Sequence, residues 1–228
     1  SLIMPSLVET FHIEMVENGI PLSQVTLQRA DLERLDYAPD AIDASLAAAR
    51  IGPASTSQDL TAIPNPRFDW GLGPYIALSA FDPDNPLRAD LGLEATASYA
   101  FTPQFSVSGT LRGKVLGNKD TSTRLSDSVL PRVRSDQVLY DQDTTVGVKN
   151  LTLAHFGKIA TDFYTRASLG YFEQIFAGVS GEVLWKPVDS RLALGAELNH
   201  VMQRDTDGLF GFDDYDYEIT TGHLSGYY

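Results

Sequence analysis

From Trp70 onward, apolar side chains occur at every second position in several runs. Some runs extend over about ten residues, the length of a tilted membrane strand, whereas strands of soluble proteins usually have about five or six. Successive side chains of a β-strand point to opposite faces, so this period predicts strands with one apolar and one polar face. One run carries, on its apolar face, Leu91, Leu93, Ala95, Ala97, Tyr99 and Phe101.

The order of the connections points to one kind of β protein. We place strands near residues 71–81, 91–101, 105–116, 144–156, 162–172, 178–186, 191–201 and 217–228. Every second connection is a short turn, at 102–104, 157–161 and 187–190, and the remaining, odd-numbered connections include every long loop. Outer-membrane β-barrels have short periplasmic turns and long outer loops. The predicted fold class is therefore mainly β, with an antiparallel outer-membrane-type β-barrel over residues 61–228, of which about eight strands are seen.

Residues 1–60 predict a small periplasmic α/β domain and linker, on the side where the first barrel strand starts. Residues 11–15 alternate, Asn18-Gly19 is a hairpin turn, and Val25 and Leu27 mark a second strand. A helix is expected from Ala41 to Arg50, with Asp40 as N-cap, Asp43 at the capping-box position and Gly52 closing it. The polar stretch 53–66 predicts a linker.

The amino-acid composition limits which functions and partners are compatible with the sequence. No run of 18 or more apolar residues exists, which excludes a helical membrane span. Thirty acidic against seventeen basic residues, a net charge of −13, argue against nucleic acid as a partner and favour cations or neutral polymers. These 228 residues contain no cysteine, so none of them can form a disulfide, a thiolate metal site or a lipidated N-terminal cysteine. Residues 1–5 lack a signal sequence and 225–228 continue a strand pattern, so we expect a piece of a longer chain.

Charged residues on the polar face are mixed in sign and interleaved with glycine and serine, which suits a hydrated barrel lumen, although a solvent-facing sheet would look much the same. The candidate lumen-facing charges are Glu94, Arg112, Lys114, Arg166, Glu182, Lys186, Arg191 and Glu197.

Two long loops carry further candidate sites. An acidic and aromatic extracellular loop could bind Ca²⁺ through carboxylates or stack on sugar rings, or could simply be solvated; its residues are Asp205, Asp207, Phe210, Phe212, Asp213, Asp214, Tyr215 and Asp216. In the loop 117–143, Arg132 and Arg134 could meet acidic sugars or phosphates, or pair with neighbouring aspartates and hold the loop over the barrel mouth.

Nothing in the sequence indicates an enzyme or a resident cofactor. The four histidines lack metal-ligand spacing. Ser190 and His200 are the closest candidate pair for hydrolysis, but they lie at opposite ends of one expected strand, roughly 30 Å apart at the usual rise per residue. The two side chains therefore cannot react together.

Three segments resemble the YjbH family of exopolysaccharide and group 4 capsule operons: "SDSVLPRVRSDQVLY" (126–140), "TRASLGYFEQIFAGVSGEVLWKPVDSRLALGAELNHVMQRD" (165–205) and "LFGFDDYDYEITTGHLSGYY" (209–228). The resemblance implies a non-enzymatic β-barrel protein of the Gram-negative outer membrane that assists polysaccharide export, with periplasmic domains beside the barrel. Family members are usually longer lipoproteins, and the resemblance carries over no catalytic residue.

The expected partners are outer-membrane lipid and polysaccharide or other components of an export machinery. Two alternatives remain open at this point. One is a structural subunit of a larger outer-membrane assembly, whose open strand edge pairs with another protein. The other is a soluble periplasmic carbohydrate-binding β-sandwich.

Overall fold

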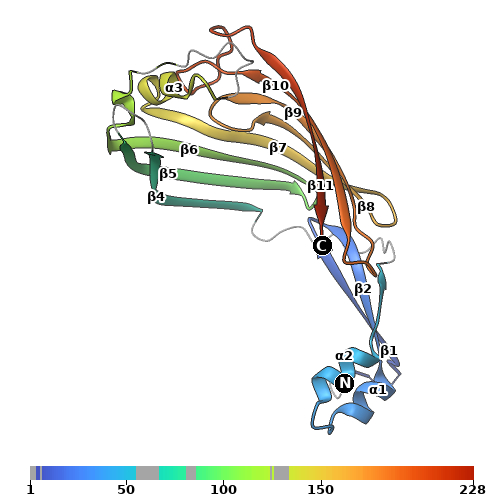
Figure 1. The fold of residues 1–228 in the computed structure, drawn as a ribbon. Coiled ribbons are helices and arrows are strands. Elements are labelled where there is room, and N and C mark those ends of the chain that lie inside the picture. Colours follow the sequence, from blue (N-terminus) through green and yellow to red (C-terminus); the bar gives the residue numbers. More distant parts are fainter. Residues whose placement is uncertain (1–3, 6, 55–66, 81–85, 124, 126–133) are drawn as a thin grey trace.

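A computed structural model of the chain describes residues 4–5, 7–54, 67–80, 86–123, 125 and 134–228. It contains a three-stranded and an eight-stranded sheet, both antiparallel (Figure 1). The mainly β character expected from the alternation is confirmed. Among these residues, no helix is both long and apolar enough to cross a membrane.

The small sheet has the order β1-β2-β3, with strands Thr10–Glu17, Ile20–Gln28 and Arg50–Pro53. Asn18 and Gly19 both have positive φ, 49° and 68°, as the two central residues of a hairpin turn of type I′ require. The expected hairpin is thus confirmed. Two helices, α1 (Arg29–Leu35) and α2 (Ala41–Ala48), lie between β2 and β3.

Four details of this region differ from the prediction. Helix α1 was not expected, and α2 ends at Ala48 because Arg50 already belongs to β3. Asp40 occupies the N-cap position, but its side chain makes no cap hydrogen bond. Pro53 is the last residue of β3 rather than the start of a linker, since Arg50–Pro53 pairs with residues 23–26 of β2. The rest of the predicted linker, 55–66, lies outside the described residues.

The large sheet is a meander in which each strand pairs with its neighbour in sequence. Its strands are β4 (Phe68–Ala80), β5 (Leu87–Thr102), β6 (Phe105–Gly117), β7 (Val146–Ala160), β8 (Phe163–Tyr171), β9 (Phe176–Trp185), β10 (Ala193–Gln203) and β11 (Glu218–Tyr227). All eight predicted strands are present. Strand β5 begins four residues earlier than expected, because Leu87 to Asp90 pair with the end of β4.

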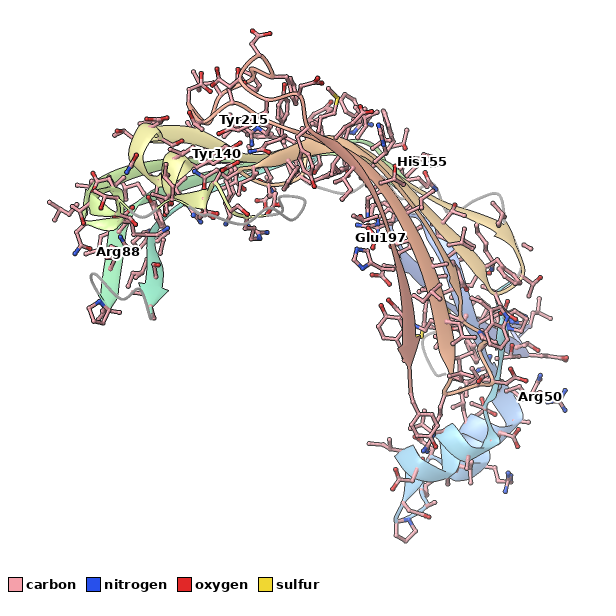
Figure 2. All side chains as sticks on the ribbon, turned by 45° about the horizontal axis from the view of Figure 1, so that its top comes forward. Arg50, Arg88, Tyr140, His155, Glu197 and Tyr215 are labelled. Atoms are coloured by element: carbon pink, nitrogen blue, oxygen red, sulfur yellow. The ribbon has the colours of Figure 1, made fainter. Side chains whose placement is uncertain are left out.

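The two faces of this sheet are chemically opposite, as the alternation predicted. Figure 2 shows the sheet as an arch, with Glu197 on its inner side and His155 on its outer side. The outer face is apolar and exposed: Leu72 is 66% and Leu198 63% accessible. Each strand contributes at least one exposed aliphatic side chain to it: Leu72, Leu93, Leu111, Leu151, Leu169, Val183, Leu198 and Leu224. Among the described residues, no second sheet covers this outer face.

The sequence predicted a partial, possibly incomplete barrel, and the described residues form no closed one. In the described part of the chain, β4 pairs only with β5 and β11 pairs only with β10, so the sheet has two open edges. The antiparallel meander itself, with short turns at one end and long loops at the other, is as predicted.

The hairpin tip of the small sheet contacts the large sheet at its short-turn end. Gln104, in the turn between β5 and β6, donates from Nε2 to the carbonyl oxygen of Gly19 at 2.9 Å. Near the next short turn, Lys158 donates to the Pro21 carbonyl oxygen at 3.0 Å and Tyr164 to that of Leu22 at 3.4 Å. The small sheet therefore lies beside the short turns, as Figure 1 also shows.

Candidate functional site

The inner face of the arch gathers the charged residues singled out in the sequence. Six of the eight lie on strands β5 to β10 and face inward: Glu94, Arg112, Lys114, Arg166, Glu182 and Glu197. Lys186 and Arg191 lie outside the strands, in the exposed connection between β9 and β10. The lumen role of this face stays a prediction.

One ionic cluster joins strands β5, β6 and β7. The Glu94 carboxylate accepts hydrogen bonds from Arg112 at 2.7 Å and from Lys149 at 3.2 Å. The Arg112 guanidinium lies 4.2 Å from the centroid of the Tyr75 ring, within the range of a cation–π contact. Lys149 was missed because it is the extra residue of a β-bulge, where the pairing of β6 with β7 shifts between Thr110 and Leu111.

A second cluster joins β8, β9 and β10. Glu182 and Glu197 are directly opposite each other in the ladder, a placement that would repel if nothing lay between them. Arg166 lies between them and pairs with both, with its guanidinium 2.9 Å from Glu182 and 3.4 Å from Glu197. Ser180 donates from its hydroxyl to Glu197 at 3.1 Å. The cluster therefore holds two carboxylates around one guanidinium, with a serine hydroxyl beside them.

A groove of about 710 Å³ runs along this second cluster. Its lining comes from strands β7 to β11, with Phe172 and Glu173 from the connection between β8 and β9 and Arg134 from the loop before α3 (Gln137–Asp143). Serine, threonine and asparagine side chains lie beside phenylalanine rings in it. A volume of this size is within the usual range of ligand sites.

A smaller cavity of about 50 Å³ lies where the loop after β6 meets the inner face. Lys114 and Lys119 border it, and each pairs with an aspartate, Asp120 at 2.7 Å and Asp141 at 2.9 Å. The hydrogen bond from Lys114 lowers the pKa of the Asp120 carboxyl below its ordinary value. These ion pairs tie the short 3₁₀ helix η1 (Lys119–Thr121) and helix α3 to the sheet.

The long-loop end is organised by a buried arginine that sequence reasoning did not identify. Arg204 is 0% exposed and donates to four carbonyl oxygens, those of Val148, Glu173, Gly208 and Leu209, at 2.6–3.2 Å. Its guanidinium also lies 4.7 Å from the Tyr171 ring centroid. Burial lowers the pKa of Arg204 from its ordinary value.

Tyr140 of α3 extends this buried centre. It is 0% exposed, packs with Ile175 and Phe176, and donates its hydroxyl to the Arg204 carbonyl oxygen. Burial raises the pKa of Tyr140 to about 12. The only fully buried apolar cluster of the described residues thus lies under the long loops.

Several residues of the acidic and aromatic loop make contacts within the protein. Asp205 accepts from the backbone amide of Asp214, and Asp207 from that of Leu209, both at 2.8 Å. Phe210 and Phe212 pack on Tyr171, with ring centroids 5.4 Å and 5.8 Å apart. Asp213, Asp214 and Asp216 are exposed and Tyr215 is partly buried. Within the described residues, no group of three or more histidine or acidic side chains could hold a metal ion.

The next candidate residues are Arg132 and Arg134 of the loop 117–143. Arg134 pairs with Glu173 across the mouth of the groove, rather than with an aspartate of its own loop. Arg132 lies outside the described residues. The loop is held down by other contacts, such as the hydrogen bond from Gln203 to the Asp136 carboxylate at 3.1 Å.

Ser190 and His200 are engaged separately. His200 lies on the outer face and shares a hydrogen bond with Thr220 at 3.0 Å. Ser190 bonds to the backbone of Leu192 within its own turn. The structure does not bring this pair together.

Comparison with known proteins places this geometry in a family. A family model described as "Exopolysaccharide biosynthesis protein", YjbH, matches residues 1–228. The chain belongs to the YjbH family. It is 33% identical over 228 residues to the "Uncharacterized lipoprotein YjbH" of Escherichia coli K12, a match that covers 95% of this chain and 32% of that protein. The chain therefore spans about a third of this relative. No solved structure matches.

Proposed function

We propose that this chain forms part of the wall of an outer-membrane β-barrel that assists the export of an exopolysaccharide. In this proposal the outer face of the large sheet contacts lipid and the inner face lines a water-filled interior. The protein performs no chemistry and acts together with other components of an export machinery.

The observation that carries the proposal is a single-layered sheet whose apolar face is uncovered in the described structure. Exposing apolar surface to water costs about 25 cal/mol per Å², so aliphatic side chains contributed by all eight strands would strongly favour a covering. Lipid supplies that covering for a sheet with an apolar outer face and a polar inner face. A soluble sandwich would need a second sheet on this face.

The paired charges of the inner face support the second half of the proposal. Placing an ionised side chain against lipid costs free energy. The cost is avoided when the side chain faces water and has an oppositely charged partner. The Glu94 and Arg166 clusters supply partners across neighbouring strands. The family's link to exopolysaccharide then suggests what passes through such an interior.

The orientation follows from the position of the small sheet. It contacts the short turns, which in outer-membrane barrels lie on the periplasmic side. We place the N-terminal region in the periplasm and the loops around Arg204 outside the cell.

The test is membrane integration and heat-modifiability of the protein in its own cells. We expect extraction with detergent only, and a gel mobility that changes on boiling. Leu198→Asp, on the outer face, should reduce the membrane-integrated fraction, whereas Asn199→Asp, its inward-facing neighbour, should not. Release without detergent, or equal loss from both variants, would overturn the membrane assignment.

Export itself needs a second measurement. A strain without the gene should carry less surface polysaccharide, and the wild-type gene should restore it. Unchanged surface polysaccharide would contradict the export role while leaving the membrane assignment intact.

A second candidate function is that of a structural subunit in a larger outer-membrane assembly, which the two open edges favour. Unpaired strand edges bind other strands. The chain has no cysteine, so Gly73→Cys in β4 and Thr221→Cys in β11 can be linked selectively. Crosslinks between different chains support the assembly, and exclusively internal crosslinks support closure by the protein's own edges.

A further inference from the structure

We infer that the groove across β7 to β11 binds a neutral polysaccharide segment, held by a row of hydroxyl and amide side chains that crosses four strands. The inference rests on the proposed function, because polysaccharide reaches this groove only if the inner face lines an export route. It goes further by naming the binding residues and the charge class of the polymer.

The row is created by the register of the sheet. Ser168 of β8 is opposite Ser180 of β9, Ser180 is opposite Asn199 of β10, and Asn199 is opposite Thr221 of β11. All four side chains line the groove. Neighbouring strands are about 4.8 Å apart, so the row offers donors and acceptors at a repeat close to the length of one pyranose ring. Successive sugars can therefore meet successive strands.

A second row runs parallel to the first, two residues away from it on each strand. It contains His223, Glu197, Glu182 and Arg166, which are opposite one another in the same way. Charged side chains that are fixed in ion pairs hold their hydrogen-bond acceptors and donors in defined directions. Sugar hydroxyls use both, since each hydroxyl donates one hydrogen bond and accepts others.

Aromatic rings border the groove at its β7 and β8 side. Phe156 is opposite Arg166 in the ladder, and Phe172 follows directly after β8. Both are partly exposed and line the groove. The C–H face of a pyranose ring packs on an aromatic ring, while its hydroxyls point outward to polar groups. Hydroxyl-binding rows beside phenylalanine rings match both parts of a sugar.

The charge balance selects a neutral polymer. Both arginines that line the groove are already paired, Arg166 with Glu182 and Glu197, and Arg134 with Glu173. Glu182 and Glu197 share the single Arg166 guanidinium, which leaves one negative charge in excess beside the groove, and the whole chain carries a net charge of −13. An anionic polymer would have to displace carboxylates from their partners and would meet this excess of negative charge. A neutral chain meets no such penalty.

The experiment uses the detergent-solubilised full chain, on an array of neutral and uronic-acid oligosaccharides. We expect binding to neutral glycans and none to the uronic-acid series. Asn199→Ala and Ser180→Ala should each weaken binding about three- to tenfold, the loss of one or two hydrogen bonds. His200→Ala, the outward-facing neighbour of Asn199, is the matched control and should bind as the wild type does.

The outcomes separate this inference from the proposed function. If the protein is extracted and heat-modifiable as proposed but no neutral glycan binds, the groove assignment is wrong and the membrane assignment stands. Preference for uronic-acid glycans, or equal weakening by His200→Ala, also overturns it. Ser168→Trp serves as a second variant, because a ring placed in the groove should abolish binding without removing an ion-pair partner.

Discussion

The two ends of the large sheet are stabilised in different ways. At the long-loop end, a buried arginine, a buried tyrosine and a small apolar cluster hold loops that come from distant parts of the sequence. At the short-turn end, the strands are joined by tight turns, and a few hydrogen bonds attach the small sheet. We therefore expect the long-loop end to resist unfolding more strongly, and the small sheet to detach more easily at the short-turn end.

The largest effect is expected at Arg204. Arg204→Met removes every donor while keeping a long side chain, and an unpaired buried carbonyl costs roughly 1 to 3 kcal/mol. The Gly208 carbonyl oxygen keeps a hydrogen bond from the backbone amide of Val148. For the other carbonyls together, we expect a loss of about 3 kcal/mol in the free energy of unfolding, measured by urea titration. Arg204→Lys should be intermediate, because an ammonium offers fewer donors. A wild-type midpoint for Arg204→Met would show that the long-loop end does not depend on this residue.

Tyr140→Phe should destabilise the long-loop end by a smaller amount. The change removes the hydroxyl that donates to the Arg204 carbonyl oxygen and leaves the ring in the apolar cluster. We expect a loss of about 1 to 2 kcal/mol in urea unfolding. Tyr215→Phe, on a partly exposed ring, is a comparison that should change the midpoint less. Equal effects would argue against a special role for the buried hydroxyl.

The same tyrosine makes the long-loop end sensitive to alkali. Its folded pKa of about 12 exceeds the ordinary value of 10.0. The stabilisation from the neutral hydroxyl is therefore complete below pH 10 and is lost as the pH rises toward 12. The two-unit difference corresponds to roughly 3 kcal/mol. Between pH 9 and about 12, wild-type stability should fall more steeply than that of Tyr140→Phe; parallel curves would contradict this.

At the short-turn end, Gly19→Ala should detach the small sheet without unfolding the large one. Gly19 has φ of +68°, and an added Cβ would lie 2.3 Å from Cβ of Pro103. We expect faster proteolysis between the two sheets, with an unchanged urea midpoint for the large sheet. Gly52→Ala is the matched control, since nothing lies within 4 Å of an added Cβ there. Equal proteolysis of both variants would show that the hairpin tip does not hold the sheets together.

The smallest effect is expected from Asp120→Asn at the long-loop end. The pair with Lys114 is partly exposed, and such pairs contribute at most about 1 kcal/mol. Because the folded pKa of Asp120 is lowered, this contribution is present above its ordinary value of 3.8 and is lost as the pH falls further. The variant should differ from the wild type at pH 7 and converge with it in acid. A constant difference across this range would point to a structural cause other than the charge.

Much of the strand arrangement could be predicted because alternation is a local property. Leu93 and Glu94, or Leu198 and Asn199, differ in polarity and therefore fall on opposite faces wherever the strand lies. Strand β3 and the role of Arg204 depend on partners distant in sequence, which local patterns do not contain. Lys149 breaks the alternation of its strand, and that break is the sequence signal of the bulge that brings it to Glu94. For the loop aspartates the sequence left Ca²⁺ binding and plain solvation open, and it did not predict that Asp205 and Asp207 accept hydrogen bonds from backbone amides of their own loop.

The bulge at Lys149 also bears on how such strands tolerate changes in length over evolution. On one side of it, outward positions are even-numbered, as in Val146 and Val148; on the other side they are odd-numbered, as in Leu151 and Leu153. Loss of Lys149 alone would leave an unbroken alternation and keep every other side chain of β7 on its present face. Loss of one residue from the regularly paired stretch 151–158 would instead turn the side chains on one side of the gap to the opposite face. Natural variation in the length of β7 should therefore concentrate at this position.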